Sequence, residues 1–518
     1  MVIVAMAGAV VVFNITSLQF ALERIAHDFG AAASSVEMGI VVYSLVVAAL
    51  ILPAAKLAPS WGARRMFRGA TVLFAAGMTL MALSPGSVAM LLAQMVAGVA
   101  TAAMMPTLVL LIVDHYGGEI QRTALNWLAR AQALAIVPAF LMAGALTTWL
   151  SWRVCFGVLA VWTVTICKLS GKMHSSGPTC AANLDRVGLS LEVLAIFLIG
   201  WGCSKLTQRS ASLLSFKTTS NLVNVSQVAT LIVVGAILFG AFFRWSRRYG
   251  AAGGTPLIAL GMFGRSSERS VLLSIFSVGV LSAAITFVIP LYIENVQGRT
   301  PFYTAVAFMP FAGASFAGGA FVVQLRGRVH PRRIARYGFL VVAISAALLG
   351  ETMRGRWTDL PVIIGLLLVG LGKGALATLL FKFLLARAST DRNADVTPLC
   401  NSMDYFAGAV GTVLASVLVI GTLGASIQSQ LRENPAIPVE LREQINLDNV
   451  SFISNDRLRT ALSRTNATPL QTEEAIRINT QGRLHALRLC LFALAALAAV
   501  AFFAAAALPD WESTVRSD

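Results

Sequence analysis

The sequence predicts an all-α integral membrane protein that is built from two similar halves, and three observations lead to this prediction. The chain of 518 residues is 57% hydrophobic and only 12% charged, with a mean hydropathy of +0.75. A water-soluble domain carries about 25% charged residues. The apolar residues gather into long runs, and a short basic turn occurs twice, at matching places in the two halves.

The predicted spans follow from the apolar runs, because a helix needs about 20 apolar residues to cross about 30 Å of hydrocarbon. Fourteen runs meet this requirement, some of them with the help of their flanks: 2–22, 37–58, 69–84, 88–113, 124–150, 154–170, 187–206, 227–243, 271–293, 303–325, 338–350, 361–385, 403–425 and 485–508. We therefore predict fourteen transmembrane helices.

The distribution of basic residues predicts which side the loops face. Fourteen spans place both termini on one side, and the loops on that side carry more Lys and Arg than the short loops on the other. By the positive-inside rule both termini are expected in the cytoplasm. The formal charge of +16 does not indicate nucleic-acid binding, because the basic residues form short clusters between apolar runs. We expect them to face anionic lipid headgroups.

One predicted outer loop, 426–484, is long, polar and charge-balanced. Asn455 precedes DRLRTALSR, and Thr468-Pro469 precedes LQTEEAIR, and both places have the features of a helix start. We expect a small helical excursion that continues into the last span. This excursion either covers the gate of the transport path or contacts a partner protein. The alternative is that it is a solvated connector between two spans.

The repeated basic turn reads LAPSWGARR at 57–65 and LRGRVHPRR at 325–333, which is 268 positions later. Each copy links the second and third spans of its half and ends on paired arginines. Arginine side chains at such a place can satisfy helix-end carbonyl groups or acidic side chains. The repeat predicts two six-span halves, a plan in which transporters rock one bundle against the other around a central site.

The repeat divides the chain into five predicted segments. They are an N-terminal six-helix bundle at 1–170, two inserted helices with their flanks at 171–270, the first five helices of a C-terminal bundle at 271–425, the partly helical outer loop at 426–484, and the last helix with a cytoplasmic tail at 485–518.

Several stretches of the chain resemble the signature segments of one family. They are AKLAPSWGARR at 55–65, ALAIVPAFLMAG at 133–144 followed by TTWLSWRVCF at 147–156, PLYIENVQGRTPFYTAVAFMPFAG at 290–313, and FNITSLQFALERIAHDFGA at 13–31. The sequence looks like the major facilitator superfamily, and within it the fourteen-span drug:proton antiporter family. The resemblance covers nearly the whole chain except the outer loop.

The resemblance implies the major facilitator fold, with two six-helix bundles and two inserted helices, in the cytoplasmic (inner) membrane of a bacterium. It implies efflux by a monomer that needs no cofactor or metal and draws on the proton gradient. It also implies a conformational-gating motif made of Gly62, Arg64, Arg65, Arg332, Arg333, Pro138 and Gly144.

The chain departs from the family pattern at four positions. Pro59 stands where the first basic turn usually has an acidic residue, and Val137 replaces a glycine of the fifth-span signature. Asn14 stands where many members have a first-span aspartate, and Gln94 where a fourth-span arginine is usual. These departures leave facilitated transport open beside proton-coupled transport.

Ionisable residues inside the spans are the first candidates for function, because a charge near the bilayer centre costs on the order of 3 kcal/mol. Arg130 shares a face of the fifth span with Val137 and Gly144. Lys373 lies near the middle of the twelfth span, among three glycines. We expect both to line a cavity; the alternative for each is a pairing with a neighbour, or for Arg130 a reach to the interface.

Two acidic residues also fall within spans. Glu192 lies near the cytoplasmic end of the seventh span, which is expected outside the central bundles, so a structural pairing is favoured over a role in transport. Asp404 lies near the start of the thirteenth span. It is either a carboxylate that binds and releases protons or the partner of a basic side chain.

The remaining substrate or coupling candidates are uncharged and polar: Asn14, Tyr43, Gln94, Asn126 and Gln132. Together with Arg130 and Lys373 they predict a polar, basic cavity. Such a cavity favours an amphiphilic substrate with a negative or neutral polar group over a lipophilic cation.

These features predict a secondary transporter that exports hydrophobic or amphiphilic small molecules by alternating access. One alternative is a dedicated exporter of an organic anion, such as a siderophore, a fatty acid or a natural product, and another is a receptor that binds ligand without moving it. An enzyme is not expected, because the sequence has no nucleophile–base or metal-ligand constellation. The expected partners are the substrate and membrane lipid; participation of a periplasmic adaptor protein is left open.

Overall fold

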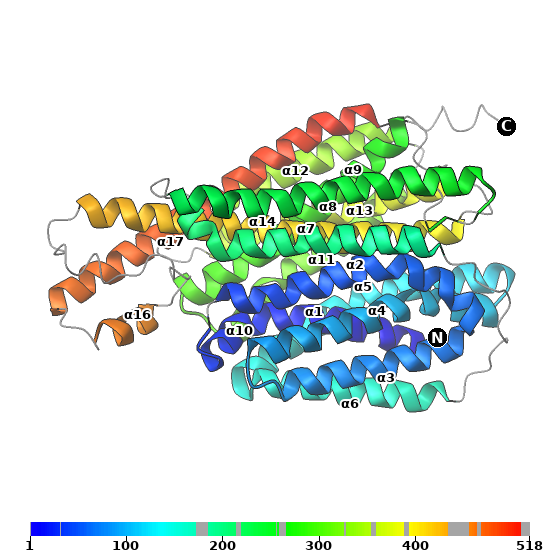
Figure 1. Ribbon diagram of the computed structural model, residues 1–518, viewed down its shortest axis with the longest axis horizontal. Coiled ribbons are helices and arrows are strands. Elements are labelled where there is room, and N and C mark those ends of the chain that lie inside the picture. The colour runs from blue at the N-terminus through cyan, green and yellow to red at the C-terminus, as the bar shows by residue number, and fades with distance from the viewer. Residues whose placement is uncertain are drawn as a thin grey trace.

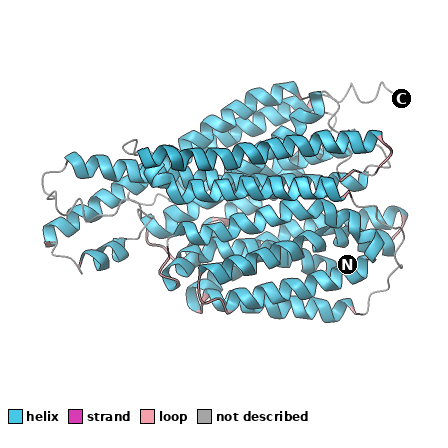
Figure 2. Cartoon of the chain, in the orientation of Figure 1, coloured by secondary structure: helices cyan, strands magenta, loops and turns pink. Residues whose placement is uncertain are grey.

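The computed structural model describes residues 2–31, 33–171, 185–213, 219–254, 256–257, 266–325, 328–353, 359–387, 393–433, 455–463 and 468–508. Within these ranges all regular structure is helical (Figure 2). The backbone of Asn126 and Arg130 is helical, but their side chains, two of the predicted site residues, lie outside the described part of the structure.

The helices follow one another along the chain with short connections. The first half contains α1 (Val2–Asp28), α2 (Ala33–Trp61), α3 (Ala63–Ala82), α4 (Ser87–His115), α5 (Gly118–Trp149) and α6 (Trp152–Ser170). Next come α7 (Arg186–Leu213) and α8 (Thr219–Ala251). The second half contains α9 (Ser266–Leu291), the π-helix η2 (Tyr292–Val296), α10 (Pro301–Ala307), α11 (Met309–Gln324), α12 (Pro331–Thr352), α13 (Asp359–Arg387), α14 (Asn393–Glu433), α16 (Asn455–Leu462), α17 (Pro469–Ala504) and the 3-10 turn η5 (Ala505–Ala507).

The two halves pack their helices in the same pattern. In the first half α3 contacts α4 and α6, α1 contacts α5 and α6, and α2 contacts α4. In the second half α12 contacts α13 and α17, α9 contacts α14 and α17, and α11 contacts α13. The halves form two bundles that lie side by side, blue to cyan and green to red in Figure 1.

Both bundles run along the long axis of the molecule, which therefore has two ends (Figure 1). We name them the α1–α2 end and the α2–α3 end, after the connections found there. Helix α1 begins and α17 finishes at the α2–α3 end, while α14 and α17 extend beyond the bundles at the α1–α2 end. This extension, with α16, forms an arm.

The arm contains the helical excursion predicted within 426–484. Helix α16 begins at Asn455, and α17 begins after Thr468, as the sequence predicted. Thr468 caps α17 with a capping box, because its hydroxyl group accepts a hydrogen bond from the Gln471 amide and the Gln471 side chain accepts one from the Thr468 amide. Residues 434–454 of the predicted loop lie outside the described residues.

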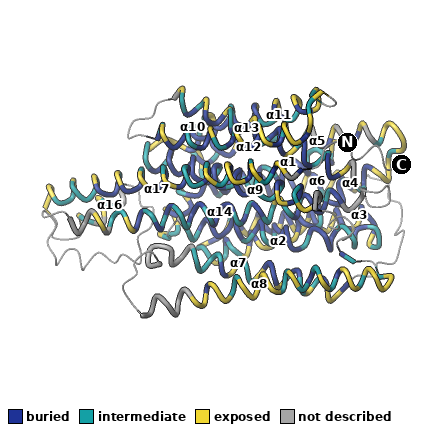
Figure 3. The backbone as a smooth tube through the Cα atoms, turned by 90° about the horizontal axis from the view of Figure 1, so that it is seen from above, coloured by how far each residue is buried: buried dark blue, intermediate teal, exposed yellow. Residues whose placement is uncertain are grey.

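The inserted helices α7 and α8 lie along one side of the molecule (Figure 3). Helix α7 contacts α2 of the first bundle and α14 of the second, so it covers the seam between them. Helix α8 packs on α7 and is the more exposed of the two (Figure 3). The ring of Phe239 on α8 also stacks on Phe406 of α14, with centroids 6.2 Å apart.

Twelve helices in the described part of the chain are long and apolar enough to cross a membrane. The predicted spans 69–84 and 124–150 coincide with α3 and α5, which do not meet the same criterion. Helix α3 is basic at its start, with Arg64, Arg65 and Arg68, and in the described part of α5 the apolar helix runs over Leu134–Trp149. The count of fourteen crossing helices therefore remains a prediction.

Candidate functional site

A hydrogen-bonded amide pair lies in the interior of the first bundle. Asn14 of α1 donates from Nδ2 to Oε1 of Gln94 on α4, at 3.3 Å, and both side chains are buried. Asn14 Oδ1 and Gln94 Nε2 have no hydrogen-bond partner among the described residues. The two positions at which the family resemblance leads one to expect an aspartate and an arginine therefore contact each other as neutral amides.

Tyr43 of α2 connects this pair to the second bundle. Its hydroxyl group donates to Thr101 Oγ1 on α4 at 2.9 Å and also interacts with Asn14 and Tyr405. The rings of Tyr43 and Tyr405 meet edge to face with centroids 6.2 Å apart. Because Tyr405 belongs to α14, this contact crosses from one bundle to the other.

Asp404, beside Tyr405, faces Lys373 inside the second bundle. The charges of the two side chains are near enough to interact, but no salt bridge joins them in the described part of the chain, so both alternatives for Asp404 stay predictions. Lys373 lines a small cavity between α9, α12 and α13 and lies over the Phe311 ring, with its Nζ atom 5.4 Å from the centroid. Asp404 lies next to Gly279 of α9, and its residue surface is exposed in the structure.

We call this continuous set of side chains the central layer: Asn14, Gln94, Thr101, Tyr43, Tyr405, Asp404 and Lys373. Five of its members are predicted site residues. Thr101 and Tyr405 were not predicted from the sequence, because their contacts depend on which helix faces meet in the packed bundles. A layer of this kind can bind a polar group of a ligand from both bundles at once.

The other predicted site residues lie elsewhere. The Gln132 side chain packs against α1 at Gly8, where an added Cβ atom would be 2.9 Å from its Cγ. Glu192 on α7 is buried, and its Oε2 atom has no hydrogen-bond partner among the described residues. The structural pairing expected for Glu192 is thus not seen at this oxygen among the described residues.

The two bundles contact each other closely at the α1–α2 end. Gly144 of α5 lies against α10, where an added Cβ atom would come within 2.6 Å of Ala305 Cβ and 2.9 Å of the Pro301 oxygen. One turn further on, Thr148 Oγ1 accepts a hydrogen bond of 2.9 Å from the Phe302 amide. The glycine of the predicted gating motif thus permits α5 and α10 to touch.

Aromatic side chains fill the space beneath this contact. Phe20 of α1, Phe140 of α5 and Phe308 form a cluster in which each ring meets the other two edge to face, with centroids 5.3 to 6.0 Å apart. All three side chains are buried. Since Phe308 belongs to the second bundle, the cluster closes the α1–α2 end between the bundles.

Arg483 of α17 ties the arm to the same end. It is fully buried, donates to the Asn295 carbonyl oxygen at 2.7 Å and also donates to Asn455 of α16. Its charge interacts with Glu23 of α1. One side chain therefore connects the arm, the second bundle and the first bundle.

The two basic turns at the α2–α3 end make equivalent contacts. Arg64, at the start of α3, donates to the Gly171 carbonyl oxygen at the end of α6. Arg332, at the start of α12, donates to the Leu508 carbonyl oxygen at the end of η5. Gly62 has a φ of 83°, which allows the chain to turn between α2 and α3. Each turn thus braces the third helix of its bundle against the sixth.

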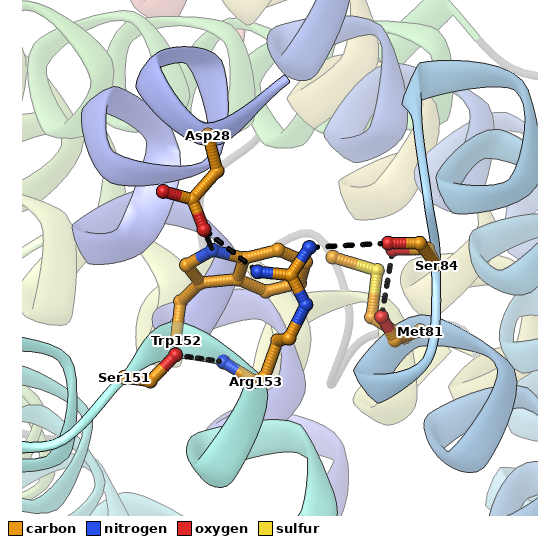
Figure 4. Close-up of polar contacts among 6 residues, drawn as sticks. All are labelled: Asp28, Met81, Ser84, Ser151, Trp152 and Arg153. Carbon is orange, nitrogen blue, oxygen red and sulfur yellow. Dashed lines mark hydrogen bonds and ion pairs between the residues drawn. The ribbon is translucent and has the colours of Figure 1, made fainter.

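The SWR sequence at 151–153 forms a corner at the α1–α2 end (Figure 4). Asp28 Oδ2 accepts hydrogen bonds of 2.7 Å from the Trp152 indole and from the Arg153 guanidinium group. Arg153 also reaches the Ser84 carbonyl oxygen at 3.4 Å, and the Ser151 hydroxyl group caps α6. These contacts hold α1, α6 and the α3–α4 connection together as one unit.

Comparison with known proteins agrees with this architecture. The family model described as Major Facilitator Superfamily matches residues 4–412. The puromycin resistance protein pur8 of Streptomyces alboniger is 24% identical over 434 residues, which cover 82% of this chain and 82% of that protein. The drug efflux pump JefA of Mycobacterium tuberculosis is 24% identical over 447 residues, which cover 83% of this chain and 82% of the pump.

A solved structure shares the fold. It is a bacterial homologue of the human lysosomal transporter Spinster in an inward-facing, unoccupied conformation, and its TM-score is 0.61 at 12% sequence identity. The match covers 98% of this chain and 96% of that chain.

Proposed function

The chain belongs to the major facilitator superfamily, and on this premise we propose that it is a secondary transporter that exports hydrophobic or amphiphilic small molecules. It works by alternating access, with fourteen spans and both termini in the cytoplasm of a bacterial cell. The transporter acts as a monomer in the inner membrane.

The observation that carries this proposal is the position of the central layer. Tyr43 and Tyr405 meet where the bundles join, and the Lys373–Asp404 pair lies directly behind them. A ligand bound there contacts both bundles, so a rocking motion can expose it to either end in turn. With the termini in the cytoplasm, the α1–α2 end faces outward, and the seal at Gly144 and Phe308 makes this the inward-facing state.

The charges of the central layer bear on the substrate. Lys373 alone would favour an organic anion, but Asp404 opposes its charge. The walls of the Lys373 cavity are otherwise mostly apolar, with Val278, Leu281 and Leu376 among them. This combination supports an amphiphilic substrate with a neutral or zwitterionic polar group, and it weakens the dedicated anion exporter as an alternative.

We take the proton gradient as the energy source. Where the family pattern has a charged pair, this chain has Asn14 and Gln94, which cannot bind and release protons. Asp404 is the carboxylate of the central layer, and its residue surface is exposed. It is therefore our candidate for proton exchange near the substrate.

A receptor that binds ligand without moving it is the second candidate. The neutral Asn14–Gln94 pair supports it, because loss of charged coupling residues is what such a protein would show. In that case the central layer still binds ligand, but no flux follows.

Flux measurements in proteoliposomes test these proposals. The probes are puromycin, chosen from the name of a relative, and a fluorescent fatty acid as an organic anion, each with and without a pH gradient. Puromycin export with linked proton movement supports the antiporter, and flux without proton movement indicates facilitated transport. Binding without flux supports the proposal that the protein is a receptor. A preference for the fatty acid over puromycin supports the dedicated exporter of an organic anion.

A further inference from the structure

A buried carboxyl group lies between the two bundles near the α1–α2 end, outside the central layer. Glu37, close to the start of α2, is only 1% exposed. Its Oε2 atom accepts a hydrogen bond of 2.5 Å from the hydroxyl group of Ser416 on α14. Its Oε1 atom has no hydrogen-bond partner among the described residues. The bond to Ser416 joins the first bundle directly to the second.

The surroundings of Glu37 are apolar. Met38 and Val41 of α2 pack with Ala409 and Val413 of α14 in one small buried cluster next to it. A carboxylate ion is poorly tolerated in such a place, because one hydroxyl donor replaces a whole hydration shell. A neutral carboxylic acid is tolerated far better.

Charged neighbours do not compensate for this burial. Helix α2 packs against α1, α3, α4, α7 and α14. The charged and titratable side chains that the structure describes on them are Glu23, Arg24, His27 and Asp28 on α1, Arg64, Arg65 and Arg68 on α3, Asp114 and His115 on α4, Arg186, Glu192, Cys203 and Lys205 on α7, and Cys400, Asp404 and Tyr405 on α14; α2 itself carries Tyr43 and Lys56. None of these described groups stabilises a negative charge on the Glu37 carboxyl group. Its surroundings consist of apolar packing and the hydrogen bond from Ser416.

We propose that Glu37 is a proton-binding site that controls the seal between the bundles at the α1–α2 end. In the sealed state the proton is on Oε1, which leaves Oε2 to accept the hydrogen bond from Ser416. When the bundles separate, α14 withdraws and the carboxyl group meets water, where a glutamic acid releases its proton at neutral pH. Opening therefore releases one proton to water, and sealing takes one up by forming an O–H bond.

The direction of the pH effect follows from this exchange. The sealed state binds one more proton than the open state, so acid favours sealing and alkali favours opening. The equilibrium constant for opening is the ratio of open to sealed protein. At pH values above the pKa that Glu37 has when it is exposed to water, this constant rises by up to about tenfold for each pH unit. The inference rests on the proposed function only in that the bundles separate at this end.

Hydrogen–deuterium exchange of the full-length protein in lipid nanodiscs tests the site without a substrate. Wild type and Glu37→Gln are compared at the same pH, between about pH 5 and about pH 9, so that the intrinsic exchange rate cancels. Glutamine keeps the shape of the side chain and accepts from Ser416, but it cannot release a proton. Peptides from 34–48 and 405–420 report on the seal, and peptides from α3 and α6 are the control.

We expect the ratio of wild-type to Glu37→Gln exchange in 34–48 and 405–420 to grow with pH, by up to about tenfold per unit, while α3 and α6 stay unchanged. Ser416→Ala keeps the carboxyl group, so its exchange is expected to stay pH-dependent. A ratio that does not change with pH would overturn the proposal, and so would the loss of pH dependence in Ser416→Ala.

The wild-type protein gives a check that needs no variant. After correction for the intrinsic rate, its exchange in 34–48 and 405–420 is expected to rise with pH, and its exchange in α6 is not. Exchange that is flat in both regions contradicts the proton site. Absence of puromycin flux in proteoliposomes counts against the transporter proposal and leaves this result unaffected.

Discussion

Tyr43 of α2 and Tyr405 of α14 meet edge to face, with ring centroids 6.2 Å apart and an interplanar angle of 71°. The contact joins the two bundles at the level of the Asn14–Gln94 pair on one side and the Lys373–Asp404 pair on the other. Five residue positions that the sequence predicted as substrate or coupling candidates converge on it. The predictions below test this arrangement and the contacts that surround it.

Removal of the Tyr43 hydroxyl group tests the link within the central layer. Tyr43→Phe loses the hydrogen bond to Thr101, which lowers the free energy of unfolding by about 1 kcal/mol. Tyr43→Ala also removes the buried ring and its contact with Tyr405, for a further loss of about 3 to 5 kcal/mol. Puromycin flux is expected to fall in the order wild type, Tyr43→Phe, Tyr43→Ala. Equal flux in all three proteins would remove Tyr43 from the site.

The Lys373–Asp404 pair makes a prediction about stability. Lys373→Met and Asp404→Leu each leave one charge without its partner inside the bundle. We expect the double variant to be less destabilised than the sum of the two single variants, with a coupling energy of about 1 kcal/mol, since Asp404 is exposed and no salt bridge joins the described side chains. Thermal unfolding of the four proteins in nanodiscs measures this energy. A coupling energy of zero means that the charges do not interact.

Gly144 makes a prediction about the seal. A valine side chain at this position collides with Ala305 and the Pro301 oxygen, so Gly144→Val is expected to keep α5 and α10 apart. Faster hydrogen exchange in 301–308 and a loss of puromycin flux follow. Gly157→Val is the matched control, because an added Cβ atom at Gly157 meets no atom within 4 Å. Identical behaviour of the two variants would contradict the role of this contact.

The two basic turns are expected to give equal effects in the two bundles. Arg64→Ala and Arg332→Ala each remove a hydrogen bond to a carbonyl oxygen at a helix end, for a loss of about 1 kcal/mol each. The controls are the exposed neighbours, Arg65→Ala and Arg333→Ala, with smaller expected losses. Chemical denaturation of the four variants compares them. A large effect at one turn and none at the other argues against equivalent roles.

Much of the fold could be predicted from the sequence, because its signals are local or repeated. The apolar runs identified every helix that became a span candidate, and Thr468 and Asn455 marked the helices of the arm. The 268-residue offset pointed to equivalent turns, and Arg64 and Arg332 contact helix-end carbonyl groups in the way that was anticipated. Hydropathy alone did not settle α3 and α5, whose charged or polar turns interrupt their apolar runs.

Less of the candidate site could be predicted, because its contacts depend on which helix faces meet. Glu37 marked only the polar edge of a predicted span, and its burial comes from the packing of α14 on α2. Arg483 fell within the predicted loop, although α17 continues through it and buries it against Asn295. Pairing with a basic side chain was one alternative for Asp404, but only the packing of α14 near α13 brings it close to Lys373.

A reversible cross-link across the seal tests the central claim, that the bundles alternate around the central layer. Thr148 and Phe302 are in contact across the bundles, through the hydrogen bond of 2.9 Å between the Phe302 amide and Thr148 Oγ1. Puromycin flux is measured for Thr148→Cys with Phe302→Cys, oxidised and then reduced, beside each single variant. We predict that oxidation of the double variant stops flux, that reduction restores it, and that the single variants keep it. Full flux with the cross-link formed would contradict alternating access.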